Sequence, residues 1–497
     1  RARRGAASSA QRGARDFRRH RRDRATRARA AFQPHAARYS RRALCAQLQR
    51  LVDTGCLAHP MRRLTSSKIY LFGAGSLGTG VYSALPGVLL LFFLTDVLGV
   101  APAWASFAIV LPKLWSIVCD PLVGRHSDQY RGRHGSRAPY LLAGALGCTA
   151  TFAALFAVPA ALDGKAALGY VMIVYALAVT AYSVYSVPYV TLPAEMSADP
   201  QERTRIVAVR MGFMFVGALV GSAAAPALVA LFGGGREGYS IMALVLAGLA
   251  GASALIAWSV ARRLPNSVGA PNDAGQPQAA LSGAWTVPLR NRPFVALLGA
   301  YGCIAAAIAT LTAGMPYLVR HVIHGDESRL ALFFSFFVLA SIGGLAAWTH
   351  VASRLGKERA LIASAVLLGA ACIPLALHPF TMTLLMTAVA AGLAVGGLQL
   401  LPFALLTDHV RSEIGRAGAY TGIWTAVEKA GLAIGPLVVG ALLAVGGFEA
   451  SSGTSPTPQP AEALIAIRLA VSAAPALLLV GALVLHRLSK RRAAGTP

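Results

Sequence analysis

Charged residues are scarce in this sequence, and acids are the scarcest of them. Asp, Glu, Lys and Arg make up 13% of the 497 residues, against about 25% in a typical soluble domain. Only 20 acids stand against 46 Lys and Arg, which leaves a formal net charge of +26. Hydrophobic residues reach 56%, and the mean hydropathy is +0.57. This composition excludes a disordered chain, a disulfide-rich secreted module and most soluble enzymes, and it indicates a multi-pass membrane protein.

Motifs of catalysis and metal binding are missing as well. The six cysteines are scattered and form no CxxC or CxxH pair, so neither a disulfide framework nor a metal site follows from them. The chain has no HExxH, GxSxG or Walker-type sequence, and its loops are too short to house a catalytic domain. We therefore expect no enzymatic activity, no resident cofactor and no metal.

Residues 1–60 differ from the rest of the chain. They contain 16 Arg, no Lys, 3 acids and no long apolar run, which excludes a secretory signal. Three interpretations stay open: a basic arm for nucleic acid or anionic lipid, an organellar transit peptide, or translated DNA upstream of a start at Met61. We expect this extension to lack stable packing and transport to survive its deletion, and we predict no nucleic-acid partner.

Twelve apolar segments follow, each long enough to cross a bilayer as a helix. They cover 69–97, 101–124, 139–160, 166–192, 205–232, 239–261, 293–320, 330–352, 359–377, 380–407, 418–447 and 463–486. Without residues 1–60, the connections and ends on one side of the predicted membrane carry 22 Lys and Arg, and those on the other side carry 4. The positive-inside rule then predicts that both termini are cytoplasmic, which requires an even number of spans and agrees with the count of twelve.

The twelve spans divide into two halves of six. Residues 263–290, rich in Pro, Gly, Asn and Ala, form the longest internal connection and indicate a cytoplasmic linker between 61–262 and 291–497. Gly217 and Gly221 in the fifth span match Gly431 and Gly435 in the eleventh, and GxxxG spacing permits close helix packing in lipid. Two six-helix repeats predict the major facilitator fold, an all-α membrane architecture.

Charges inside the predicted spans need an explanation, because each is costly near the bilayer centre. Arg210 in the fifth helix and Arg468 in the twelfth could simply reach an interface with their long side chains. Lys113 and Asp120 lie seven residues apart and share one face of the second helix. Glu428 and Lys429 are adjacent in the eleventh helix and point about 100° apart. A polar cavity between the halves would use them for coupling to a cation, whereas the alternative is structural ion pairing.

Several segments resemble the glycoside–pentoside–hexuronide:cation symporter family, the melibiose-permease-like branch of the major facilitators. The most specific is KLWSIVCDPLVGRHSD at 113–128, followed by VPYVTLPAE at 187–195. GIWTAVEKAGLAIGP at 422–436 and MPYLVR at 315–320 agree with the family's helices 11 and 7. The similarity runs in order over about 65–450.

The resemblance implies a cluster of acids on helices 1, 2 and 4 that binds the coupling cation and the sugar hydroxyls. Asp120 matches the second helix 2 acid, whereas two other positions fall on Ser116 and Ser186 and the helix 1 position has no carboxylate. Lys429 matches the family's helix 11 lysine, and Lys113 stands where a basic residue is usual. One carboxylate makes a poor sodium site but can carry a proton, so we predict proton coupling rather than sodium coupling.

We therefore predict a secondary transporter of the bacterial inner membrane, a monomer that moves a sugar or glycoside-like solute by alternating access. The alternatives are a lipid or amphipath transporter, an uncoupled facilitator on the same fold, or a receptor or membrane enzyme without transport. Coupling would involve Asp120, Lys113, Lys429 and Glu428. The substrate would contact Tyr82, Ser116, Tyr182, Tyr185, Ser186, Tyr301, Gln399 and Trp424.

Charges in the loop after helix 2, and an echo of them after helix 8, resemble the major-facilitator loop motif. We predict that they gate the cytoplasmic side by tying the halves together through charge pairs, although they could also serve only the positive-inside rule. The candidates are Gly124, Asp128, Arg131, Arg133, Arg137, Arg205, Arg354 and Lys357.

Overall fold

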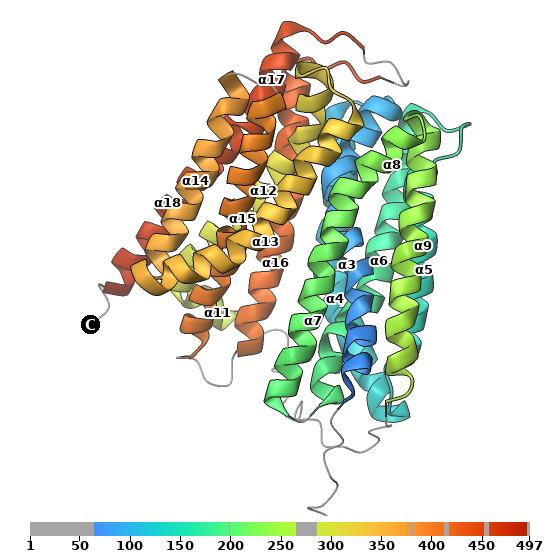
Figure 1. Cartoon of the computed structure of the whole chain (residues 1–497), viewed down its shortest axis with the longest axis vertical. Coiled ribbons are helices and arrows are strands. Elements are labelled where there is room, and N and C mark those ends of the chain that lie inside the picture. The colour runs from blue at the N-terminus through green and yellow to red at the C-terminus, as the bar shows by residue number, and fades with distance from the viewer. Residues whose placement is uncertain are drawn as a thin grey trace, which may run out of the picture. The chain divides into compact units, whose positions relative to one another are not determined.

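Twelve helices of the described residues are long and apolar enough to cross a membrane, as predicted. The computed structural model describes residues 64–197, 199–264, 286–377, 381–411, 417–451 and 457–494. The predicted extension at 1–60 and most of the predicted linker at 263–290 lie outside these residues. Figure 1 shows the helices up to α9 on one side and those from α12 onward on the other.

The first half, as we use the term, comprises the helices between Ser66 and Ala261. They are α3 (Ser66–Phe92) with the π-helical turn η1 (Phe93–Val97), α4 (Pro102–His134), α5 (Ala138–Phe156), α6 (Gly164–Met196), α7 (Pro200–Leu219) with η2 (Val220–Ala224) and α8 (Ala225–Leu231), and α9 (Gly235–Ala261).

The second half comprises the helices from Arg292 onward, preceded by the short α11 (Thr286–Arg290). They are α12 (Arg292–Tyr317) with the π-helical turn η4 (Leu318–Val322), α13 (Glu327–Leu355), α14 (Lys357–Leu377), α15 (Thr381–Arg411), α16 (Ala417–Val445), and α17 (Ala461–Val471) with α18 (Ala473–Ala494).

Local sequence explains several helix boundaries. Pro102 occupies the first turn of α4, where its missing N–H group is not needed. The Asn291 side chain accepts a hydrogen bond from the Phe294 N–H (3.2 Å) and caps α12, and Asp326 caps α13 through the Arg329 N–H (3.2 Å). Gly135 ends α4 with a positive φ of 77°, a conformation that glycine adopts without strain.

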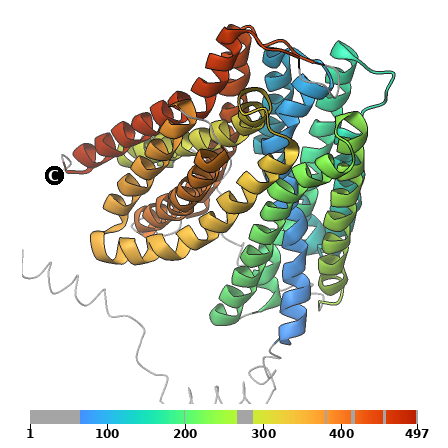
Figure 2. The ribbon, with the colours of Figure 1, turned by 45° about the horizontal axis from the view of Figure 1, so that its top comes forward.

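The two GxxxG sequences lie where helices approach most closely. A Cβ atom on Gly217 of α7 would stand 2.0 Å from the Leu77 carbonyl oxygen of α3, and one on Gly431 of α16 would stand 2.6 Å from the Gly302 carbonyl oxygen of α12. The fifth helix of each half therefore packs closely against the first helix of the same half, because the glycines at these contacts have no side chain. Figure 2 shows α7 beside α3.

Contacts between the halves involve a few helices only. α4 packs against α16, α12 against α3, and α13 against α7, η2 and α8. Two ends of the helices are distinguished below by their charges. The Arg-poor end carries the described connections at 98–101, 157–163, 232–234, 323–326, 446–451 and 457–460, and the Arg-rich end carries the other described connections.

One sequence-based boundary was wrong, and one predicted span is interrupted. The second span was predicted to stop at residue 124, but α4 continues to His134, so Gly124, Asp128 and Arg131 lie on a helix and not in a loop. The last span, predicted at 463–486, is confirmed at Ala461–Arg487, but α17 ends at Val471 and Ser472 takes a non-helical conformation (φ −122°, ψ −75°) before α18 begins. Polar residues extend α4 beyond the apolar run, which hydropathy alone does not register.

Candidate functional site

A carboxylate near the middle of α4 contacts both halves of the protein. The Ser183 hydroxyl of α6 donates a hydrogen bond to Asp120 Oδ1 (2.6 Å). The Lys429 ammonium of α16 forms an ion pair with Asp120 Oδ2. The Asp120 side chain keeps 28% of its surface exposed and the Lys429 side chain keeps 25%. One oxygen of Asp120 is thus held within the first half and the other is bound by the second half.

The other two residues predicted on this face of α4 use different partners. The Lys113 ammonium donates a hydrogen bond to the Leu432 carbonyl of α16 (3.2 Å), so this lysine also faces the second half. The Ser116 hydroxyl donates to the Lys113 carbonyl of its own helix (2.7 Å). Asp120 therefore has Lys429 as its ion-pair partner, while Lys113 anchors the two helices through the backbone.

Glu428 is not among the partners of Asp120 described above and lies in an aromatic cluster of the second half. Its carboxylate is close to the Tyr301 hydroxyl of α12. The Tyr301 ring stacks on Trp424, with centroids 4.2 Å apart and planes 14° apart. Trp424 is 2% exposed and Tyr301 is 9% exposed, so both rings are packed between α12 and α16 in this conformation.

The predicted aromatic residues of the first half form a second cluster. The Tyr82 and Tyr182 rings stack with centroids 4.4 Å apart, and Tyr185 stacks on Tyr189 (5.1 Å). The hydroxyls of Tyr82 and Tyr185 are buried without a hydrogen-bond partner among the described residues. Both line a small cavity of about 30 Å³ between α3, α5, α6 and α9, which is large enough for a water molecule.

Two further substrate candidates are more accessible than these rings. Ser186 of α6 is partly exposed, and Gln399 of α15 is exposed. Neither is among the partners of Asp120 described above.

At the Arg-rich end, the gating candidates form ion pairs inside the first half. Arg137 binds both Asp128 of α4 and Glu195 Oε1 of α6 (2.6 Å). Arg131 reaches the other oxygen of Glu195 (3.3 Å). These ion pairs tie the end of α4 to the end of α6, whereas the prediction placed charge pairs between the halves.

The remaining gating candidates lie apart from this cluster. The Arg205 guanidinium donates to the Ser66 hydroxyl (3.1 Å), and the Lys357 ammonium donates to the Ala404 carbonyl (3.4 Å). Arg133 and Arg354 are exposed, and Gly124 is partly exposed.

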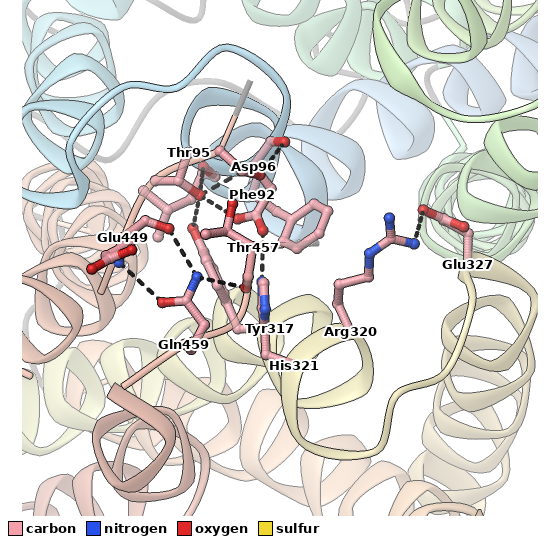
Figure 3. A network of polar contacts seen from close by, with 12 residues as sticks. Phe92, Thr95, Asp96, Tyr317, Arg320, His321, Glu327, Glu449, Thr457 and Gln459 are labelled. Carbon is pink, nitrogen blue, oxygen red and sulfur yellow. Dashed lines mark hydrogen bonds and ion pairs between the residues drawn. The ribbon is translucent and has the colours of Figure 1, made fainter. Parts of the chain in front are cut away.

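A buried polar contact joins the halves at the Arg-poor end (Figure 3). Asp96 of η1 and His321 of η4 meet through Asp96 Oδ1 and His321 Nε2 at 2.6 Å. The hydroxyls of Thr95 and Tyr317 lie 2.8 Å apart beside them. Ser451 donates its N–H to the Thr95 carbonyl (3.0 Å) and its hydroxyl to the Asp96 carbonyl (2.9 Å). The halves are therefore closed against each other at this end.

The sequence profile of a family described as MFS/sugar transport protein matches residues 71–490. The chain belongs to this family. The transporter is accordingly a multi-pass membrane protein that moves small molecules, and not an enzyme, as the sequence predicted.

Curated relatives of the transporter are similar over most of its length. It is 25% identical over 500 residues to an uncharacterized symporter of Synechocystis sp., covering 83% of this chain and 92% of the relative. It is 24% identical over 400 residues to an isoprimeverose transporter of Lactiplantibacillus pentosus, covering 78% and 80%. A glucuronide carrier protein homolog of Escherichia coli is 22% identical over 432 residues, covering 83% and 90%.

Solved structures support the fold of the transporter. A bacterial homolog of the human lysosomal transporter Spinster superposes with a TM-score of 0.68 at 13% identity, over 87% of this chain and 98% of that chain. A nucleoside transporter gives a TM-score of 0.59 at 14% identity, over 85% and 99%. At these identities the likeness concerns the major facilitator fold alone.

Sequence reasoning missed several residues of the transporter that the structure brings together. Ser183 lies one turn before the predicted Ser186 on α6, and this spacing was the available signal. Arg210 of α7, which the sequence marked as a charge inside the fifth helix, lies over the Tyr189 ring, 4.2 Å from its centroid, and this aromatic partner was not predicted. Asp96 and His321 stand at the ends of apolar runs, where polar residues usually meet the membrane surface. Their positions in the sequence therefore do not indicate a buried contact.

Proposed function

We propose that the transporter carries a sugar or glycoside together with a proton, and that Asp120 is the residue that binds the proton. One observation carries this proposal: the Asp120 carboxylate is shared between Ser183 of the first half and Lys429 of the second. When a side chain that contacts both halves gains or loses a charge, the attraction between the halves changes, and this can control their movement. The family description and the names of the isoprimeverose and glucuronide relatives support a sugar compound as the substrate.

The surroundings of Asp120 favour a proton over sodium as the coupling ion. Sodium prefers a cage of several oxygen ligands with carboxylates for charge balance. Here one carboxylate oxygen is bound by the Lys429 ammonium and the other accepts the Ser183 hydroxyl, while the Ser116 hydroxyl donates to the Lys113 carbonyl. A lysine and a proton can instead exchange for each other on one carboxylate oxygen without any further ligand.

The proposed cycle follows from this exchange. While Asp120 is ionised, its ion pair with Lys429 links α4 to α16. A proton that binds Oδ2 neutralises the carboxylate and releases the Lys429 ammonium to water or to the substrate. The halves can then rock around the bound solute and expose it on the other side, as in other transporters of two-repeat construction.

The Arg-rich end is proposed to face the cytoplasm of a bacterial cell and the Arg-poor end to face outward, by the positive-inside rule. The two six-helix halves would act as the moving bodies, and a monomer would suffice because the site lies within one chain. One relative, of Escherichia coli, is named an inner membrane symporter, 26% identical over 149 residues and 30% of this chain. The aromatic and polar candidates of both halves remain our proposed substrate contacts.

Uptake into proteoliposomes tests the proposal. The purified transporter would be supplied with a panel of labelled glycosides, with an inward pH gradient, an inward sodium gradient or neither. We expect accumulation of at least one sugar compound with the pH gradient alone. Accumulation driven only by sodium would contradict proton coupling, and equilibration without accumulation under both gradients would make the protein a facilitator.

A lipid-like solute is the second candidate. A sodium-dependent lysophosphatidylcholine symporter of Danio rerio is 29% identical over 163 residues, which is 33% of this chain. The buried aromatic cluster around Tyr82 and the loss of acids at Ser116 and Ser186 would suit an amphipath better than a polyol. Labelled lysolipid in the same uptake panel separates the two substrates.

A further inference from the structure

The Asp96–His321 contact combines two properties that no other described contact between the halves shares. Both side chains are ionisable, and both are almost fully buried, with 7% and 2% of their side-chain surfaces exposed. Asp96 belongs to η1 of the first half and His321 to η4 of the second, 225 residues later. Figure 3 shows the carboxylate and the imidazole pointing toward each other. Any opening of the Arg-poor end must break this contact.

The other groups near the pair are two hydroxyls, an aromatic ring and an arginine. Asp96 Oδ2 accepts a hydrogen bond from the Thr95 hydroxyl (2.8 Å), which is itself in contact with the Tyr317 hydroxyl. The Phe448 ring meets the imidazole edge to face, with centroids 5.2 Å apart. The neighbouring Arg320 pairs with Glu327 of α13 (3.4 Å).

Water has a route to this pair from the Arg-poor end. A polar cavity of about 320 Å³ lies beside it, lined by both halves. Its titratable lining residues are Asp96, Tyr239, Arg320, Asp326 and Glu327. When the halves part, Asp96 and His321 become hydrated from this side.

We propose that Asp96 and His321 form a proton-dependent latch, which holds the Arg-poor end closed while His321 is protonated and favours opening once that proton is lost. The proposal rests on the alternating access proposed above, but not on the substrate or on the coupling residue.

The direction of the pH effect follows from the two states. A charged donor forms a stronger hydrogen bond to a buried carboxylate than a neutral donor does. The proposed latch therefore takes up one proton more in the closed state than in the open state, in which both groups are hydrated. Raising the pH favours opening, by at most about tenfold in the opening equilibrium for each pH unit.

This latch acts in the opposite sense to the coupling proton. Protonation of Asp120 is proposed to free the halves, whereas protonation of His321 holds one end shut. The latch would make the outward-open state rarer in acidic surroundings, and so it limits the proton-driven cycle when the outside is most acidic.

A cysteine at the closed contact measures opening directly. Ser106 of α4 is 1% exposed, and it meets Gly440 of α16 at the Arg-poor end. A membrane-impermeant maleimide should therefore label Ser106→Cys only when the halves part. The chain would be full length, in nanodiscs, with its six native cysteines replaced by serine. Ala101→Cys, exposed at the same end, corrects for the pH dependence of the maleimide reaction.

We expect the ratio of the two labelling rates to rise severalfold between pH 6.5 and 8 in the protein with His321, and to stay flat with His321→Gln. Tyr317→Phe is the matched control, because it removes the contact with the Thr95 hydroxyl and leaves the ionisable pair intact. It should raise the ratio at every pH and keep the slope.

Three results would overturn the latch. A labelling ratio that stays flat with pH in the protein with His321 would do so. The same holds if His321→Gln and Asp96→Asn keep the pH slope of the protein with His321. A Ser106→Cys that is never labelled at any pH would contradict alternating access as well, and this outcome is distinct from labelling without a slope. Each variant is first checked for a monodisperse elution profile, and the independent Asp96→Asn variant keeps the test decisive if His321→Gln does not fold.

Discussion

Among the described residues, two contacts between ionisable side chains cross between the halves of this transporter, and they differ in their exposure to water. The central pair, Asp120 with Lys429, retains about a quarter of the surface of each side chain. The Asp96–His321 pair at the Arg-poor end is almost completely buried. Both contain a carboxylate with one hydroxyl donor, Ser183 in the first case and Thr95 in the second.

The difference in exposure suits the two pairs to different roles. A partly hydrated carboxylate can exchange its lysine partner for a proton, because water stabilises each intermediate. The Asp96–His321 pair, called the dry pair below, is almost fully buried, and separating two buried hydrogen-bonded groups is unfavourable unless water enters. We infer that the central pair reports whether a proton is bound, whereas the dry pair holds one end of the molecule closed.

Neutralising Asp120 should have the largest effect. Asp120→Asn removes the titratable group with almost no change in volume, and the amide can still accept the Ser183 hydrogen bond. We expect pH-driven accumulation to disappear while exchange of substrate down its gradient persists, because the halves can still rock. Uptake and counterflow in the same proteoliposomes measure the two properties.

A surface aspartate serves as the control for this variant. Asp163 forms an ion pair with Arg236 and keeps 75% of its side chain exposed, so Asp163→Asn should accumulate substrate normally. Accumulation that persists in Asp120→Asn would move the coupling role elsewhere, with Glu428 as the next candidate because it is held within the second half by Tyr301.

Removing the lysine should give the second largest effect. Lys429→Gln leaves the Asp120 carboxylate without its cation, and leaving a buried charge unpaired costs roughly 3–5 kcal/mol at full burial and less here. We expect transport to fall at least about tenfold. The double variant Asp120→Asn with Lys429→Gln has no unpaired charge, so its downhill exchange should exceed that of Lys429→Gln alone. Equal exchange rates in the two proteins would show that the pair is not coupled.

Removing the hydroxyl donor from each pair compares the roles of the two pairs with a smaller loss of interaction energy. A hydrogen bond to a charged group contributes about 1.5–3 kcal/mol. Ser183→Ala should therefore change the pH at which uptake is half-maximal, because the ionised Asp120 loses a donor. Thr95→Val should instead increase labelling of Ser106→Cys and leave the pH of half-maximal uptake unchanged. A shifted uptake profile in Thr95→Val would contradict the separation of roles.

The sequence allowed the twelve spans and the central residues to be predicted, for identifiable reasons. A run of about 20 apolar residues is long enough to cross the bilayer as a helix, whatever the rest of the fold. Asp120 and Lys429 are recognisable because charged residues are rare inside such helices. The dry pair could not be predicted in this way. Asp96 and His321 lie at helix ends, 225 residues apart, and only the packing of η1 against η4 shows that they are buried. The break at Ser472 likewise has no signal in hydropathy.

The smallest effect is expected for an ion pair that does not cross between the halves. Asp128 binds Arg137 at the Arg-rich end, but Arg137 also binds Glu195, and the Asp128 side chain is 40% exposed. Asp128→Asn therefore neutralises one of two acidic partners of Arg137, which also donates to the Thr191 hydroxyl, and an exposed pair contributes only about 0.2–1 kcal/mol. We expect turnover to fall about two- to fivefold with normal membrane insertion, and Glu195→Gln to fall further because Glu195 is bound by both Arg131 and Arg137. Unchanged transport kinetics in both variants would leave these arginines with a role in topology alone. If Asp128→Asn lost as much transport as Lys429→Gln, ion pairs within one half would control the movement as strongly as ion pairs between the halves.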